Sequence, residues 1–204
     1  MILPAPPSAD APLADTPFAD TPLADTPLAD APLAGAPERG LPPIHHPQAR
    51  VLILGSFPGR ASLGAQRYYA HPRNLFWPIV EGLCGVDLDD AHCVWQARIA
   101  MLERHGIALW DVIARCERRG SLDSSIRRAQ LQDFEPLLAA MPALQAVVFN
   151  GRLAAAREAW FSARGYRTWV LPSTSPANAG TPVAAKHAAW SVLAPLCRPV
   201  DEDR

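Results

Sequence analysis

From about residue 41, short apolar runs alternate with amphipathic segments along the chain. Val51–Leu54 is apolar at every position and stops at a glycine, and Ala146–Phe149 stops in the same way at an Asn-Gly pair. Such runs are typical of strands in a parallel sheet that is buried on both faces. Two further segments are predicted as strands, Ile107–Val112 and Thr168–Leu171.

Between these strands, apolar residues recur at helical spacing. Phe, Ile, Val and Leu at positions 76, 79, 80 and 83 predict a helix over Phe76–Leu83, and Asn74 is placed to cap its start. Thr181-Pro182 has the pattern of an N-cap followed by a proline at the first helical position. The other helices are predicted over residues 91–105, 133–140, 153–163 and 182–196.

This alternation predicts an α/β fold, a three-layer α/β/α sandwich with a central, mostly parallel four-stranded sheet. In such sheets, ligands bind beyond the carboxyl ends of the strands. The loops that follow the four predicted strands begin at Gly55, Asp111, Asn150 and Pro172. We therefore expect these loops to meet at one rim and to form a site there.

The first 40 residues follow a different pattern. Residues 9–37 repeat a five-residue unit such as Ala-Asp-Thr-Pro-Leu. Proline at every fifth position excludes a continuous helix or central strand, so we expect residues 1–40 to be a disordered acidic tail and residues 41–200 to form one domain. The tail is either an inert solubilising extension or a docking arm for a partner.

Composition adds a charge asymmetry to this picture. The whole 204-residue chain carries a net charge of −1, the aspartates of the tail carry −5, and the body therefore carries +4. A mildly basic body is compatible with a polyanionic partner. Its positive charge is almost all arginine, whose planar fork suits phosphates, although biased codon usage explains the arginine content equally well.

Several protein classes are disfavoured. The four cysteines form no CxxC pair and His45-His46 has no nearby acidic or thiol partner, so we expect no metal and no cofactor. No apolar run approaches the ~18 residues of a membrane span, and the start of the chain lacks the features of a signal peptide. We expect a cytoplasmic monomer with reduced thiols and no membrane association.

Two segments of the predicted rim carry unusual residues. Gly55-Ser56-Phe57-Pro58-Gly59 exposes backbone amides, and Phe57 either stacks on a flat substrate or packs into the core. Tyr68–Trp77 places aromatic residues, a histidine, an arginine and an asparagine directly before a helix. Within it, Phe76 and Trp77 fit the core, whereas Asn74 fits capping and catalysis equally well.

These two segments resemble the hypoxanthine-DNA glycosylases of the uracil-DNA glycosylase superfamily. The His-Pro-x-Asn-x-Phe-Trp part is also similar to the bacterial mismatch-specific uracil-DNA glycosylases. The resemblance runs from about Val51 to Leu196, and other segments that fit follow in order: Leu109–Val112, Gly120–Ser124, Phe149–Gly151 and Pro172–Asn178. It implies that residues 41–200 are the catalytic domain of a monofunctional DNA glycosylase, which flips a deaminated base, foremost hypoxanthine, out of DNA and hydrolyses its N-glycosidic bond.

Two departures from the superfamily pattern bear on the mechanism. Many members have Asp or Asn after the first glycine, where this chain has Ser56, and many have a histidine in the second motif, where this chain reads Ser-Thr-Ser-Pro. Both departures match the hypoxanthine group, whose resemblance assigns catalysis to Asn74. Asn74 would orient water or bond the base, and Ser56, a poor substitute for a carboxylate, is the second catalytic candidate.

The remaining site residues follow from the resemblance and from the predicted rim. Base-binding residues are expected at Gly55, Phe57, Pro58, Tyr69 and Asn150. DNA-binding residues are expected at Arg73, Ser173, Thr174, Ser175, Pro176 and Asn178, because hydroxyls and arginines bond phosphates and a stiff proline loop can pinch the backbone.

Several alternatives stay open. Asp111 either acts on water or sugar or caps a loop, and His71 either faces the site or packs. Arg118 and Arg119 either bind phosphate or are solvated, and solvent exposure is expected for Lys186 and His187 in the last helix. The rival functions are a uracil or xanthine glycosylase of the same fold and a nucleic-acid-binding relative without catalysis.

Overall fold

The computed structural model describes residues 37–88 and 94–200. Residues 1–36 of the tail predicted over residues 1–40 therefore lie outside the described residues. Residues 91–93, the start of the helix predicted over residues 91–105, also lie outside them. No helix within the described ranges is both long and apolar enough to cross a membrane.

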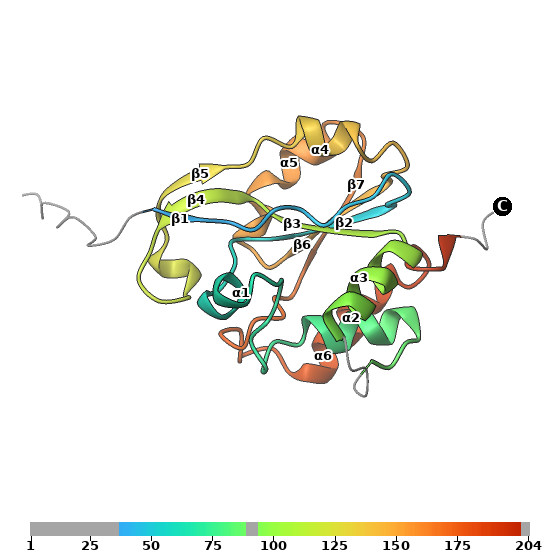
Figure 1. The fold of residues 1–204 in the computed structure, drawn as a ribbon, viewed down its shortest axis with the longest axis horizontal. Helices are drawn as coiled ribbons and strands as arrows, with labels where there is room; N and C mark the ends of the chain where they lie inside the picture. The colour runs from blue at the N-terminus through green and yellow to red at the C-terminus, as the bar shows by residue number, and fades with distance from the viewer. Residues whose placement is uncertain (1–36, 89–93, 201–204) are drawn as a thin grey trace, which may run out of the picture. The chain divides into compact units, whose positions relative to one another are not determined.

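A parallel four-stranded sheet forms the centre of the fold (Figure 1). Its strands are β2 (Val51–Gly55), β3 (Ile107–Asp111), β6 (Ala146–Asn150) and β7 (Arg167–Leu171), in the order β3-β2-β6-β7. Every residue of β2 and β6 is buried, which explains their continuous apolar runs. Gly55 pairs with Asp111, and Asn150 pairs with Leu171, so neighbouring strands end level with one another.

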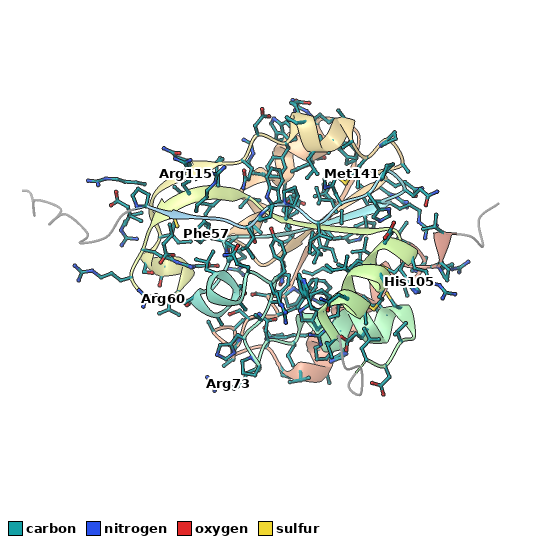
Figure 2. All side chains as sticks on the ribbon, in the orientation of Figure 1. Phe57, Arg60, Arg73, His105, Arg115 and Met141 are labelled. Atoms are coloured by element: carbon teal, nitrogen blue, oxygen red, sulfur yellow. The ribbon has the colours of Figure 1, made fainter. Side chains whose placement is uncertain are left out.

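Helices cover both faces of this sheet. Three helices lie on one face, α2 (Phe76–Cys84), α3 (Val94–Arg104) and α6 (Val183–Trp190), and two lie on the other, α4 (Glu135–Ala139) and α5 (Glu158–Ser162) (Figure 1). Alternate residues of β2 enter the two cores: Val51 and Ile53 pack with α2, α3 and α6, and Leu52 and Leu54 pack against the opposite layer. The predicted three-layer α/β/α sandwich is confirmed, and side chains fill the space between its layers (Figure 2).

Some local elements differ from the prediction. The short helix α1 (Arg60–Ala65) follows the first loop and was not predicted. The helix expected over residues 153–163 is a 3-10 turn, Ala154–Arg157, followed by α5. Helix α6 begins at Val183, so Pro182 occupies the N-cap position rather than the first turn, and the 3-10 turn Ser191–Leu193 follows it.

A second sheet was also missed. It is antiparallel, with the order β1-β4-β5, and consists of β1 (Glu38–Arg39), β4 (Ile113–Glu117) and β5 (Arg127–Leu131). Strand β5 is exposed along its whole length, so it shows no alternation of apolar and polar residues. Only Val112 separates β3 from β4, so β4 starts at the carboxyl rim of the central sheet. The connection between β4 and β5 therefore lies near that rim (Figure 1).

Candidate active site

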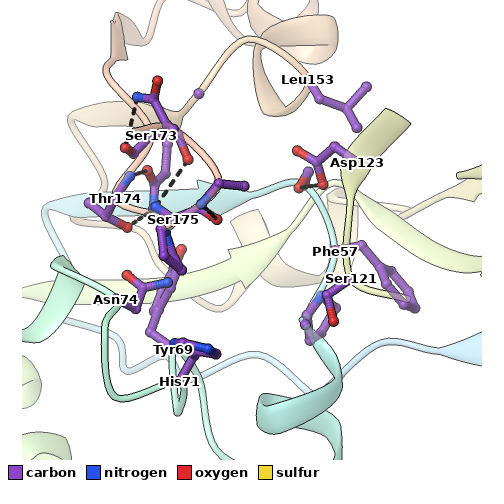
Figure 3. Close-up of a pocket in the computed structure, with 18 of the residues that line it drawn as sticks. Phe57, Tyr69, His71, Asn74, Ser121, Asp123, Leu153, Ser173, Thr174 and Ser175 are labelled. Atoms are coloured by element: carbon purple, nitrogen blue, oxygen red, sulfur yellow. Dashed lines mark hydrogen bonds between the residues drawn. The ribbon is translucent and has the colours of Figure 1, made fainter. Parts of the chain in front are cut away.

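A cleft of about 850 Å³ opens at the carboxyl ends of the parallel strands (Figure 3). The loops after β2, β6 and β7 contribute to it, as do Asp111 at the end of β3 and the connection between β4 and β5. Most of the predicted site residues line it: Ser56, Phe57, Pro58, Tyr69, Asn74, Asn150, Ser173, Thr174, Ser175, Pro176 and Asn178. Gly55 and Arg73 are not among its lining residues; Arg73 is exposed at the edge of the molecule (Figure 2).

One side of the cleft, which we call the amide wall, consists of Asn74, Asn150 and Ser173–Ser175. The Asn150 amide donates to Thr174 Oγ1 over 2.9 Å and accepts from the Thr174 N–H over 2.9 Å. The Leu75 N–H donates to the Thr174 carbonyl over 3.1 Å, which ties this loop to the start of α2. Thr174 is fully buried. It therefore shapes the loop and does not present its hydroxyl to a DNA phosphate, in contrast to the expectation from sequence.

Asn74 has one polar group engaged and one free. Its Oδ1 accepts from the N–H of Phe76, the first residue of α2, over 3.0 Å, so Asn74 bonds the start of the helix although Leu75 occupies the N-cap position. Among the described residues, Nδ2 has no partner, and Asn74 is half-buried in the cleft lining. His71, nearby in Figure 3, accepts from the Arg73 N–H at Nδ1 over 3.1 Å. In the neutral ring this contact places the proton on Nε2.

The floor of the cleft explains why position 55 is glycine. A Cβ at Gly55 would lie 2.3 Å from Asp111 Oδ1 and 3.2 Å from Tyr69 Oη, so the carboxyl group and the phenol approach the backbone directly. Tyr69 has a φ of 53° and stacks on Phe76 with ring centroids 3.8 Å apart. Within the described residues, Tyr69 Oη and Asp111 Oδ2 are buried without a hydrogen-bond partner.

Burial sets the protonation of these two groups. Burial, with a further contribution from the negative charge of Asp123, raises the pKa of Asp111 to about 7. Burial and the nearby Asp111 also raise the pKa of Tyr69 above its ordinary value. Asp111 is 3% exposed. The floor of the cleft therefore holds a neutral phenol and a carboxyl group that is partly protonated near pH 7.

The other side of the cleft, which we call the carboxylate wall, consists of Ser56, Ser121 and Asp123. Figure 3 shows Ser121 and Asp123 on this side. Ser56 Oγ donates to Asp123 Oδ1 over 2.8 Å, and Ser121 Oγ accepts from the Arg60 N–H over 3.1 Å. Partial burial raises the pKa of Asp123, against the opposing effects of the Ser56 hydrogen bond and of Arg118. Sequence reasoning did not assign Asp123 to the site, although it lies in the family-like segment Gly120–Ser124.

Arg118 supports the first loop from behind. It is 8% exposed, pairs with Glu38 at 2.7 Å, donates to the Pro58 carbonyl, and stacks at 4.7 Å over the ring of Phe57. Phe57 is itself 6% exposed and packs in the second core, although it also lines the cleft. Arg118 is thus neither solvated nor free to bind phosphate, whereas Arg119 is exposed.

The last helix contains a buried lysine. Lys186 is 3% exposed and donates from Nζ to the Asn178 carbonyl over 2.8 Å, so the expectation of solvent exposure is wrong for Lys186 and confirmed for His187. Burial lowers the pKa of Lys186. This lysine fixes the loop after β7 to α6. In the part of the chain that the structure describes, no group of three His, Cys, Asp or Glu side chains could hold a metal ion.

Comparisons with known proteins agree with this architecture. The sequence profile of the uracil DNA glycosylase superfamily matches residues 42–194. Two curated proteins, one from Methanosarcina barkeri and one from Methanosarcina acetivorans, are each named hypoxanthine DNA glycosylase and are 37% and 38% identical to this chain over 137 residues. Each alignment covers 67% of this chain and 85% of the relative.

A solved structure shows the same fold. It is the solution NMR structure of a putative uracil DNA glycosylase from Methanosarcina acetivorans, with a TM-score of 0.69 and 34% sequence identity. The match covers 78% of this chain and 97% of that chain. With a sheet of this topology, a cleft at its carboxyl rim and a family profile over residues 42–194, the chain belongs to the uracil DNA glycosylase superfamily.

Proposed function

We propose that this protein is a DNA repair glycosylase that hydrolyses the N-glycosidic bond of hypoxanthine in DNA. The superfamily membership and the two relatives named hypoxanthine DNA glycosylase support this activity. The base must leave the stack to reach a cleft at the rim of the sheet, so base flipping is part of the proposal. Ser56, at a position where a carboxylate is common in the superfamily, favours hypoxanthine over uracil as the substrate.

The observation that carries the proposal is that the Asn74 amide has its oxygen bonded to the protein and its nitrogen free in the cleft. Its Oδ1 is held by the helix start, which fixes the orientation of the amide and leaves the Nδ2 group as a preorganised donor in the cleft. Such a donor stabilises negative charge that develops on a departing base, and it needs no reorganisation during the reaction. We assign Asn74 to this contact with the base.

Other lining groups complete a pocket for a flat base. Ser56 and Phe57 contribute backbone and ring edges, Pro58 and Tyr69 contribute apolar surface, and Asn150 positions Thr174. Gly55, directly behind them, is proposed to contact the base through its backbone. For DNA contacts we propose Arg73, which lies outside the cleft, and the half-buried loop residues Ser173, Ser175, Pro176 and Asn178. Thr174 contributes by shaping that loop.

The buried lysine supports hydrolysis without a lyase step. Lys186 is the only lysine of the chain, and its amine is engaged with the Asn178 carbonyl beneath the loop. A lyase step through a Schiff base would require a free amine at the sugar, and the chain's one lysine amine is engaged in this bond. We therefore propose a monofunctional glycosylase, whose product is an abasic site in an uncut strand.

The test is an assay of base release. Duplexes that carry one deoxyinosine, one deoxyuridine or one deoxyxanthosine are incubated with the protein and treated with alkali, which cuts the strand at abasic sites. We expect strand cleavage at deoxyinosine after alkali and none before it. Faster cleavage at deoxyuridine would transfer the assignment to uracil, and no cleavage of any substrate despite DNA binding would leave a non-catalytic relative.

We also propose that the protein acts as a monomer in the cytoplasm. Cys84, Cys116 and Cys197 are free thiols in the structure, as a reducing compartment allows. Size-exclusion chromatography with light scattering, and fractionation of the source cells, test these two assignments.

A further inference from the structure

We propose that Asp123, held by Ser56, binds and deprotonates the water that attacks the sugar, and so supplies from a distant segment the carboxylate that the first motif lacks. This inference rests on the proposed glycosylase function. It adds a catalytic residue on the wall of the cleft opposite Asn74, to which the sequence motifs assign no role.

Hydrolysis requires a hydrogen-bond acceptor in the cleft. The water oxygen forms a bond to C1′ of the deoxyribose while the bond from C1′ to the base nitrogen breaks and its electron pair leaves with the base. One proton of the water must then pass to an acceptor close to the sugar. The departing base takes up a proton from solvent, and the products are free hypoxanthine and an abasic site.

The amide wall and the floor offer no suitable side-chain acceptor. Asn74 Oδ1 is engaged by the Phe76 N–H, and the free Nδ2 group only donates. The contact of His71 Nδ1 with the Arg73 N–H leaves its Nε2 as a donor in the neutral ring. Asp111 is 3% exposed, its Oδ2 is fully buried and its Oδ1 lies against the Gly55 backbone, so this carboxyl group is much less open to a substrate water than an exposed carboxylate.

Asp123 meets the requirement. Its Oδ1 accepts from Ser56 Oγ at 2.8 Å, which orients the carboxylate. Among the described residues, no group bonds its other oxygen, and the side chain is open to solvent at the mouth of the cleft. Figure 3 shows Asp123 across the cleft from Asn74 and Thr174. A base held from the amide wall would thus have water delivered from the opposite side.

The pairing also gives Ser56 a specific task. A serine hydroxyl is too weak an acid and base to replace a carboxylate, but it can orient one. The two residues are 67 positions apart in the chain, and the bond between them exists only because β4 leads the following segment back over the first loop. Ser56 is therefore a positioning residue and Asp123 the proton acceptor.

The test measures single-turnover base release from a deoxyinosine duplex by the full-length protein. We expect Asp123→Asn, which keeps an acceptor for Ser56 but cannot take a proton, to slow release by about 100-fold or more. Asp123→Ala should be equally slow, and added sodium formate should accelerate it by supplying a small carboxylate in the vacated space. Asp133→Asn, the same change at an exposed aspartate beside α4, should release base at the wild-type rate.

Each outcome decides the inference. Wild-type rates for Asp123→Asn would overturn it, and so would a slow but folded, DNA-binding Asp123→Ala protein that formate does not accelerate. Asn74→Ala serves as a second control, because a lost donor cannot be replaced by formate. An inactive wild-type protein would instead refute the proposed function, which keeps the two failures apart.

Discussion

On the amide wall, Asn150 and Thr174 exchange two hydrogen bonds, the Leu75 N–H bonds the Thr174 carbonyl, and Thr174 has no exposed surface. On the carboxylate wall, one hydrogen bond from Ser56 orients Asp123, and the segment around it is open to solvent. The core of the first wall thus consists of neutral groups that are buried and paired with one another. The second carries a charge, and it is built from the more exposed part of the rim.

This difference has a physical reason. Neutral amides and hydroxyls can be buried at little cost once they are paired, and they are then preorganised for a substrate. A carboxyl group in such buried surroundings keeps its proton to a higher pH, as Asp111 does on the floor of the cleft with a pKa of about 7. A group that must be ionised to accept a proton therefore has to remain near water, where Asp123 lies.

The largest effect is expected for Asn74, the donor of the amide wall. Asn74→Asp keeps an oxygen for the Phe76 N–H but removes the Nδ2 donor and adds a negative charge, so base release should fall by about 100-fold to 1000-fold. Single-turnover kinetics measure this rate, and circular dichroism checks that the overall helix content is unchanged. Arg73→Ala, outside the cleft, should weaken DNA binding and leave the rate at saturating protein unchanged. An active Asn74→Asp protein would remove Asn74 from the chemistry.

A pH-dependent effect is expected at Asp111, between the two walls. Its pKa of about 7 lies above the ordinary value of 3.8, so the folded protein binds this proton more tightly than the unfolded chain. The associated stabilisation is complete below about pH 4 and is lost as the pH rises through 7. The neutral Asp111→Asn protein escapes this loss. Its advantage in free energy of unfolding over wild type should grow by on the order of 2 kcal/mol between pH 5 and pH 8.

Urea denaturation of both proteins at the two pH values measures that difference. Asp133→Asn is the matched control, because Asp133 is exposed and its replacement should change the stability equally little at both pH values. A pH-independent difference between Asp111→Asn and wild type would mean that Asp111 is ionised in the folded protein, and the floor would then carry a charge like the carboxylate wall.

The two walls also differ in how much of each could be predicted from the sequence. The apolar runs of β2 and β6 predict buried parallel strands, and the rim loops with most of the amide wall follow from the order of the elements. The carboxylate wall depends on a sheet whose edge strand, β5, is exposed throughout and leaves no apolar pattern. The contact of Ser56 with Asp123 is a product of that tertiary path. The burial of Lys186 was missed for a similar reason, since a lone lysine on a helix is typical of a solvated face.

A smaller effect is expected for the pair of hydrogen bonds between Asn150 and Thr174 in the amide wall. Thr174→Val keeps the volume of the side chain but leaves the Asn150 Nδ2 group without its acceptor in a buried place. We expect a loss of about 1 to 3 kcal/mol in the free energy of unfolding. Thr174→Ser, which keeps the hydroxyl, should lose less than Thr174→Val. Equal losses for both proteins would show that the methyl group, not the hydrogen bond, holds this wall together.

The smallest effect is expected for Ser121 on the carboxylate wall. Ser121→Ala removes the acceptor of the Arg60 N–H at the start of α1, but both groups are exposed and water can replace the lost bond. The free energy of unfolding should therefore change by less than about 0.5 kcal/mol, which urea denaturation can check against Thr174→Val. A loss as large as that of Thr174→Val would mean that the carboxylate wall is as firmly held as the amide wall. In that case, exposure of the carboxylate wall to water could not explain why Asp123 is available as a base and Asp111 is not.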